Sequence, residues 1–170
     1  MALTRINNQA LTNITSAGLP SGTVLQVKQT VVNSALTVSA PGETTFADIS
    51  GMSVTITPSS ASNKILIMYN IMVGWQNTVQ NLSVRLARGA TTFVGTGGSN
   101  NNTTSYFRTH TDGIQTDASA NFYLDSPAST SALTYKLQWA LGSGNIYLNR
   151  RHNDSNYVGV SDILAMEIAG

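Results

Sequence analysis

The sequence of 170 residues contains no cysteine, and only 10% of its residues are charged. Without cysteine the chain has no disulfide, no thiolate metal ligand and no cysteine nucleophile. Its formal net charge of +1 lacks the basic excess that binding to a nucleic-acid backbone requires, so nucleic acid is not expected as a partner. Ser, Thr and Asn supply the polar surface instead. This composition is uncommon in intracellular enzymes and typical of extracellular adhesins and virus shells.

Apolar runs of membrane-spanning length are also missing. The longest run, residues 65–73, is about half of a membrane span and is interrupted by Asn70. The N-terminal stretch MALTRINNQALTN has no apolar segment of the kind found in signal peptides. We therefore expect neither membrane insertion nor an export signal.

Residues with catalytic or metal-binding chemistry are few and scattered. The two histidines, His110 and His152, each lie near an aspartate, but a metal site needs three or four ligands at set spacing. Asp112, Asp117 and Asp125 all occupy turn-like settings. No Gly-x-Ser-x-Gly motif is present, although a Ser–His–Asp triad built from distant segments stays open. We predict no catalytic residue, metal site or cofactor, and a protein that is not an enzyme.

A hydrophobic alternation of period two begins at Thr23 and continues to the C-terminus. It is clearest in residues 133–141, and it recurs in residues 53–57, 82–87 and 121–124. Turn-forming groups such as Ala40-Pro-Gly separate the runs. About eight to ten short strands at this spacing, without a long helical pattern, predict an all-β fold. We expect an antiparallel β-sandwich, jelly-roll-like in connectivity.

The last predicted strand contains the acidic residue Glu167. Alternation places this side chain on the face opposite Leu164, Met166 and Ile168. Because those three residues are apolar, Glu167 is expected to face solvent.

Residues 1–22 lack the strand alternation. They end in the breaker residues Gly18, Pro20 and Gly22, which predict a hinge before the sandwich domain of residues 23–170. Four apolar residues give this N-terminal arm something to bury against a partner: Leu3, Ile6, Leu11 and Ile14. We interpret the segment as a docking arm.

The strand predicted at residues 64–73 is apolar on both faces. In a two-layer sandwich only one face of a strand lies in the core, so the other face needs a cover. That cover is either a loop of the same chain or a neighbouring subunit. We favour the subunit because few residues remain to form a lid. Ile67, Met68 and Met72 are the candidate interface residues, which predicts a homo-oligomer.

A group of aromatic, amide and basic residues is a candidate sugar-binding surface. Its members are Trp75, Asn102, Tyr106 and Arg108. Aromatic faces beside hydrogen-bonding groups suit sugar rings, although the aromatics are equally well explained as core or strand-end residues.

Several segments resemble one protein family. They are NQALTNITSAGLPSGTVLQV (residues 8–27), VTITPSSASNKILI (54–67), LDSPASTSALTYKLQ (124–138), YLNR (147–150) and AMEI (165–168). In the same order along the chain they resemble tail-fibre or virion appendage structural proteins of aquatic, cyanophage-like bacteriophages. Residues 74–120 resemble the family least and are expected to form its variable loop face.

The resemblance implies a virion component without catalytic residues, synthesised in the host cytoplasm. The resemblance to fibre knobs implies a homotrimer. Together with the residue patterns above, we expect its arm to dock on other virion proteins and the candidate sugar-binding surface to contact a glycan on the host cell. The expected role is a short tail fibre or appendage tip. A trimeric capsid-decoration or head-fibre protein is the close alternative. A polysaccharide-degrading enzyme and a cellular lectin are more remote.

Overall fold

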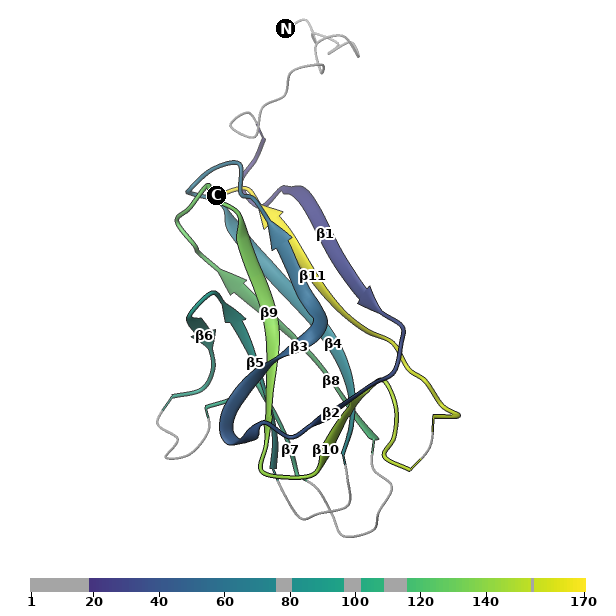
Figure 1. The fold of residues 1–170 in the computed structure, drawn as a ribbon. Helices are drawn as coiled ribbons and strands as arrows, with labels where there is room; N and C mark the ends of the chain where they lie inside the picture. The colour runs from purple at the N-terminus through teal and green to yellow at the C-terminus, as the bar shows by residue number, and fades with distance from the viewer. Residues whose placement is uncertain (1–18, 76–80, 97–101, 109–115, 154) are drawn as a thin grey trace, which may run out of the picture.

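The computed structural model describes residues 19–75, 81–96, 102–108, 116–153 and 155–170. These residues form eleven strands and no helix, and hence no helix that could cross a membrane (Figure 1). The strands are β1 (Val24–Val32), β2 (Leu36–Ser39), β3 (Gly42–Ile56), β4 (Lys64–Trp75), β5 (Asn81–Arg88), β6 (Thr91–Phe93), β7 (Ser105–Arg108), β8 (Thr116–Asp125), β9 (Leu133–Leu141), β10 (Asn145–Leu148) and β11 (Ser161–Ile168).

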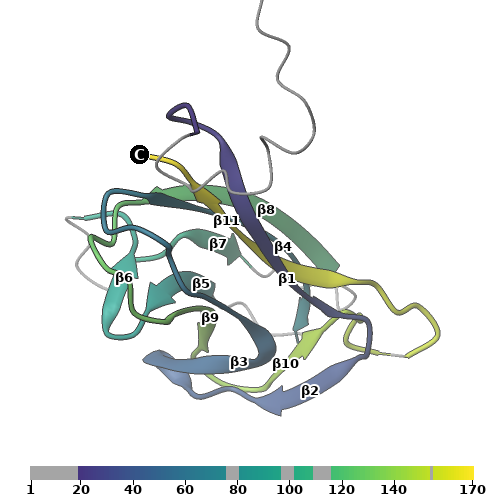
Figure 2. The ribbon, with the colours of Figure 1, turned by 90° about the horizontal axis from the view of Figure 1, so that it is seen from above.

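The strands form two antiparallel sheets that pack face to face. The six-stranded sheet has the order β1-β11-β4-β10-β2, with β8 on the other side of β4. The five-stranded sheet has the order β3-β9-β5-β6, with β7 also paired to β5. Figure 2 looks down the strands, with β8, β4, β11 and β1 in one layer and β6, β5, β9 and β3 in the other. The predicted all-β antiparallel sandwich is confirmed. Of the predicted arm and hinge, residues 1–22, the first 18 residues with all four apolar side chains lie outside the described residues.

The core lies between the two sheets and follows the period-two pattern. Ile65 and Ile71 of β4 face Leu137 and Trp139 of β9, and all four are buried. Ile67 belongs to this same row and is fully buried, so its predicted place at a subunit interface is wrong. Period two assigns Ile67 and Met68 to opposite faces but does not say which face is inside.

The prediction for the last strand is also wrong. In β11 the inward residues are Ile163, Ala165 and Glu167, which is 1% exposed, while Leu164 and Met166 are half-buried on the outer face. The sequence favoured the apolar set for the core. The structure instead places the carboxylate inside, where it is fully hydrogen-bonded.

Asn149, in the connection that follows β10, joins the ends of three strands. It adopts a left-handed backbone conformation with φ of 60° and is fully buried. Its side-chain amide donates to the carbonyls of Val32 (2.7 Å) and Ser34 (3.1 Å), and its side-chain oxygen accepts from the Ser161 hydroxyl (2.6 Å). Ser161 in turn accepts from the Met72 amide at 2.9 Å. These bonds fix the ends of β1, β4 and β11 relative to one another.

Candidate interaction surfaces

No cluster of three or more potential metal ligands occurs among the residues that the structure describes. Asp125, at the end of β8, is buried, accepts a hydrogen bond from the Tyr135 hydroxyl (2.7 Å) and pairs with Arg88 (2.9 Å). Burial raises the pKa of Tyr135, and the hydrogen bond to Asp125 raises it further. Asp117 lies exposed near the other end of β8, so these two carboxylates do not form an acid pair. His110 and Asp112 lie outside the described residues.

Glu167 is the centre of a buried polar cluster. Its carboxylate accepts hydrogen bonds from the Gln26 amide (2.5 Å), the Asn63 amide (2.6 Å), and the backbone amide (2.6 Å) and hydroxyl (2.8 Å) of Ser59. Burial alone raises the pKa of Glu167, but these hydrogen bonds outweigh it and hold the pKa below its ordinary value. Four donors occupy the carboxylate and join β1, the β3–β4 connection and β11. The cluster is therefore a structural clamp.

The outer face of the five-stranded sheet is polar and largely satisfied by its own residues. Asp48 accepts from Lys136 (2.7 Å) and from Gln138, which also accepts from Arg85 at 2.8 Å. The Arg85 guanidinium lies 3.9 Å from the centre of the Phe46 ring. Hydrogen bonds from Lys136 and Gln138 lower the pKa of Asp48. This face is a typical solvated surface.

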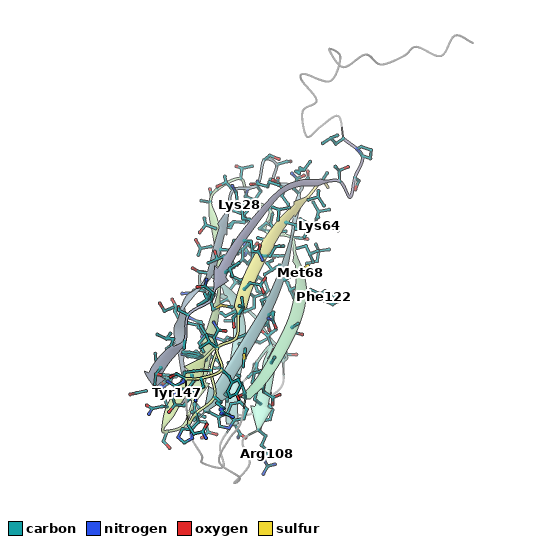
Figure 3. The ribbon with its side chains drawn as sticks, turned by 90° about the vertical axis from the view of Figure 1, so that its right-hand side faces the viewer. Lys28, Lys64, Met68, Arg108, Phe122 and Tyr147 are labelled. Atoms are coloured by element: carbon teal, nitrogen blue, oxygen red, sulfur yellow. The ribbon has the colours of Figure 1, made fainter. Side chains whose placement is uncertain are left out.

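The outer face of the six-stranded sheet is apolar, in contrast to the polar face. Strand register places side chains in rows across β1, β11, β4 and β8. One row contains Val27, Met166, Leu66 and Leu124, and the next contains Gln29, Leu164, Met68 and Phe122. Figure 3 looks onto this face, with Met68 and Phe122 next to each other on neighbouring strands. We call this surface the apolar face.

Side chains of the apolar face are exposed to an extent that is unusual for their type. Phe122 is 78% exposed, Val27 50%, Leu124 49% and Met68 43%. A hollow of about 260 Å³ lies beside Phe122 and is lined by Met68, Tyr69, Asn70, Ala120, Asn121, Phe122, Asp162 and Leu164. Covering these exposed side chains would contribute on the order of 5 kcal/mol. Contiguous exposed apolar surface of this kind marks interaction sites.

Of the three predicted interface residues on β4, only Met68 is exposed on the apolar face. Met68 lies at its centre, whereas Met72 is half-buried and packs against the backbone of Gly159 in the same chain. Phe122 and Leu124 were missed as interface candidates, because their alternation with Asn121 and Tyr123 does not reveal which set points outward.

The predicted sugar contacts separate into a core residue and surface residues. Trp75 is 2% exposed and packs against Phe107 with ring centres 6.1 Å apart, so its assignment as a receptor contact is wrong. Tyr106 and Arg108 are exposed on β7, while Asn102 is half-buried and has its own partner. The sequence alone does not distinguish an aromatic residue at a strand end that faces the core from one that faces solvent.

Two arginine–tyrosine stacks near the β10 end were not predicted. The Arg150 guanidinium lies 4.9 Å from the Tyr147 ring centre, and that of Arg151 lies 4.6 Å from the Tyr157 ring centre. Figure 3 shows Tyr147 and Arg108 toward the same end of the sandwich. The adjacent arginines are visible in the sequence, but their aromatic partners are three and six residues away, so the sequence did not indicate the stacking.

A comparison with protein-family models found no match for this chain, and a search of curated proteins found no significantly similar sequence.

Proposed function

We propose that this chain is a structural subunit of a bacteriophage particle and assembles as a homotrimer. Its proposed place is a short tail fibre or appendage tip. The observation that carries the proposal is the apolar face, because a broad exposed apolar surface on a sandwich with one polar outer face calls for a partner. The resemblance of residues 8–27 and 124–138 to phage appendage proteins supplies the kind of particle.

The state of the buried carboxylates supports a structural role rather than catalysis. Asp125 is buried, with its Oδ2 atom contacted by Tyr135 and Arg88, and both carboxylate oxygens of Glu167 accept hydrogen bonds. A general acid or base needs access to a substrate proton, and neither group offers it.

We assign different partners to the N-terminal arm and to β7. Residues 1–22 dock on other virion proteins through Leu3, Ile6, Leu11 and Ile14. Tyr106 and Arg108, both exposed on β7, contact a glycan on the host surface. The close alternative is a trimeric capsid decoration or head fibre. It is favoured by the lack of a shaft or of coiled-coil heptads in the sequence.

Deleting the arm tests the proposal. Docking four apolar side chains contributes on the order of 4–8 kcal/mol, and ordering the backbone costs about 1–2 kcal/mol per residue, so one arm binds marginally. Three arms on one trimer bind together through their high effective concentration. A chain starting at Ser21 should therefore fold and trimerise normally, as checked by circular dichroism and sedimentation, and be lost from particles.

The readout is an immunoblot of purified particles, with gold labelling to locate the full-length chain on the tail or head. A full-length variant with Asn7→Ser and Asn8→Ser keeps every apolar arm residue and should be incorporated normally. Absence of the full-length chain from particles contradicts the proposal. Incorporation of the truncated chain at full occupancy would show that the anchor lies elsewhere.

A further inference from the structure

The most exposed aromatic ring among the described residues lies beside the hollow of the apolar face. Phe122 projects from β8 with 78% of its surface exposed, next to Met68 on β4 (Figure 3). We infer that the apolar face is the contact between copies of this chain, with Phe122 of one copy filling the hollow of the next. This inference rests on the proposed self-assembly and names its interface.

The hollow is large enough to admit a phenyl ring and is largely apolar. Its volume of about 260 Å³ exceeds the roughly 150 Å³ of an apolar cavity that accommodates benzene. Met68, Ala120 and Leu164 give it a largely apolar lining, to which Asn70, Asn121 and Asp162 add polar groups. A methionine thioether adapts its shape to a ring and makes favourable contacts with its edge.

The extent of the apolar face suits a protein partner. The apolar face is four strands wide, at about 4.8 Å per strand, and about seven residues long, at about 3.3 Å per residue. Its projected area is therefore roughly 450 Å². Exposed patches of this size mark interaction sites, and a standard interface buries about 800 Å² of accessible surface on each partner. Lys64 and Asp162 lie in the rows at either end of the patch, which gives an apolar centre with a polar rim.

A second copy is the partner that this geometry favours. Each copy carries both a projecting ring and a hollow, so identical chains can cover each other's exposed surface without a different partner. In addition, β8 pairs only with β4 among the described strands, and its residues Phe122, Tyr123 and Leu124 are all exposed. An apolar edge strand of this kind aggregates unless a partner covers it.

Charge substitutions on the two outer faces test the inference on the full chain. Phe122→Glu and Val27→Lys place a charge on the apolar face, at β8 and β1. Ser53→Glu is the matched control, because it places a carboxylate in mid-strand on the exposed face of the other sheet. Sedimentation velocity at 1–50 µM measures the mass, and circular dichroism checks the fold.

We expect Phe122→Glu to raise the dissociation constant by about 100-fold, as for an interface hot spot, and Val27→Lys by about 10-fold. Ser53→Glu should match the wild type. Should Phe122→Glu lose its strand signal, Phe122→Ala replaces it and is expected to weaken association as well. If folded Phe122 and Val27 variants keep the wild-type mass, the interface lies elsewhere and the inference is overturned, while the proposed self-assembly stands. A monomeric wild type overturns both, and particle labelling then decides the virion location independently.

Discussion

At the residue scale, Glu167 shows how hydrogen bonding reverses the usual cost of burying a carboxylate. An isolated buried charge is strongly destabilising, but donors from Gln26, Ser59 and Asn63 replace the lost water. The sequence contained no signal for this arrangement. A glutamate in an alternating strand is ordinarily solvent-exposed, and its donors lie 104 to 141 residues away along the chain.

Replacing Glu167 by Gln should destabilise the fold and change its response to acid. The NH₂ group of the new glutamine would face the N–H and O–H donors that now bond to the carboxylate. We therefore expect a loss of about 2–3 kcal/mol in the free energy of unfolding at pH 7. The folded pKa of Glu167 lies below its ordinary value of 4.5, so its stabilisation is fully present above pH 4.5 and is lost as the pH falls through the folded pKa. The difference in the free energy of unfolding between the wild type and Glu167→Gln should therefore become smaller at acidic pH.

Urea unfolding at pH 7 and pH 3, at one fixed protein concentration, measures this effect. Glu43→Gln is the control, because Glu43 is the other glutamate of the chain and is exposed on β3. If the wild type and Glu167→Gln differ by the same free energy of unfolding at pH 7 and at pH 3, the charged carboxylate is not the stabilising form.

At the element scale, a strand can be predicted from its sequence only if it is long enough and alternates clearly between apolar and polar residues. β5 and β9, with eight and nine residues, alternate clearly enough in sequence to be predicted as strands. β2, β6, β7 and β10 have only three or four residues each, too few to establish a period. β4 and β8 each carry apolar residues on both faces, so the sequence could not say which set meets the core.

The connection between β10 and β11 depends on Asn149. Asn149→Ala removes three side-chain hydrogen bonds and places a residue with a poor preference for the left-handed region at φ of 60°. We expect a loss of about 3–4 kcal/mol in the free energy of unfolding, measured by urea titration. Asn149→Gly loses the same bonds without the backbone strain, so it should cost about 1 kcal/mol less than Asn149→Ala.

Asn153→Ala, in the exposed loop that follows, should stay within about 0.5 kcal/mol of the wild type. A similarly small effect of Asn149→Ala would contradict the role of this side chain in fixing the strand ends.

At the scale of the whole molecule, the two outer faces explain the proposed role. The five-stranded sheet presents Asp48, Lys136 and Arg85 to solvent, whereas the six-stranded sheet presents Phe122 and Met68. The sequence predicted that the second face of β4 needs a cover, and in the structure that face exposes Met68 beside Phe122 of β8. The sequence could not identify β8 as a contributor, because the pairing of β4 with β8 joins segments about fifty residues apart.

The mass of the purified wild-type chain in solution tests the central claim most directly. Sedimentation equilibrium at micromolar concentration should give three times the 18.0 kDa of the single chain. Because the contact is apolar, this mass should persist in 1 M NaCl, where exposed charge pairs are screened. A stable species of 18.0 kDa at these concentrations would contradict the account.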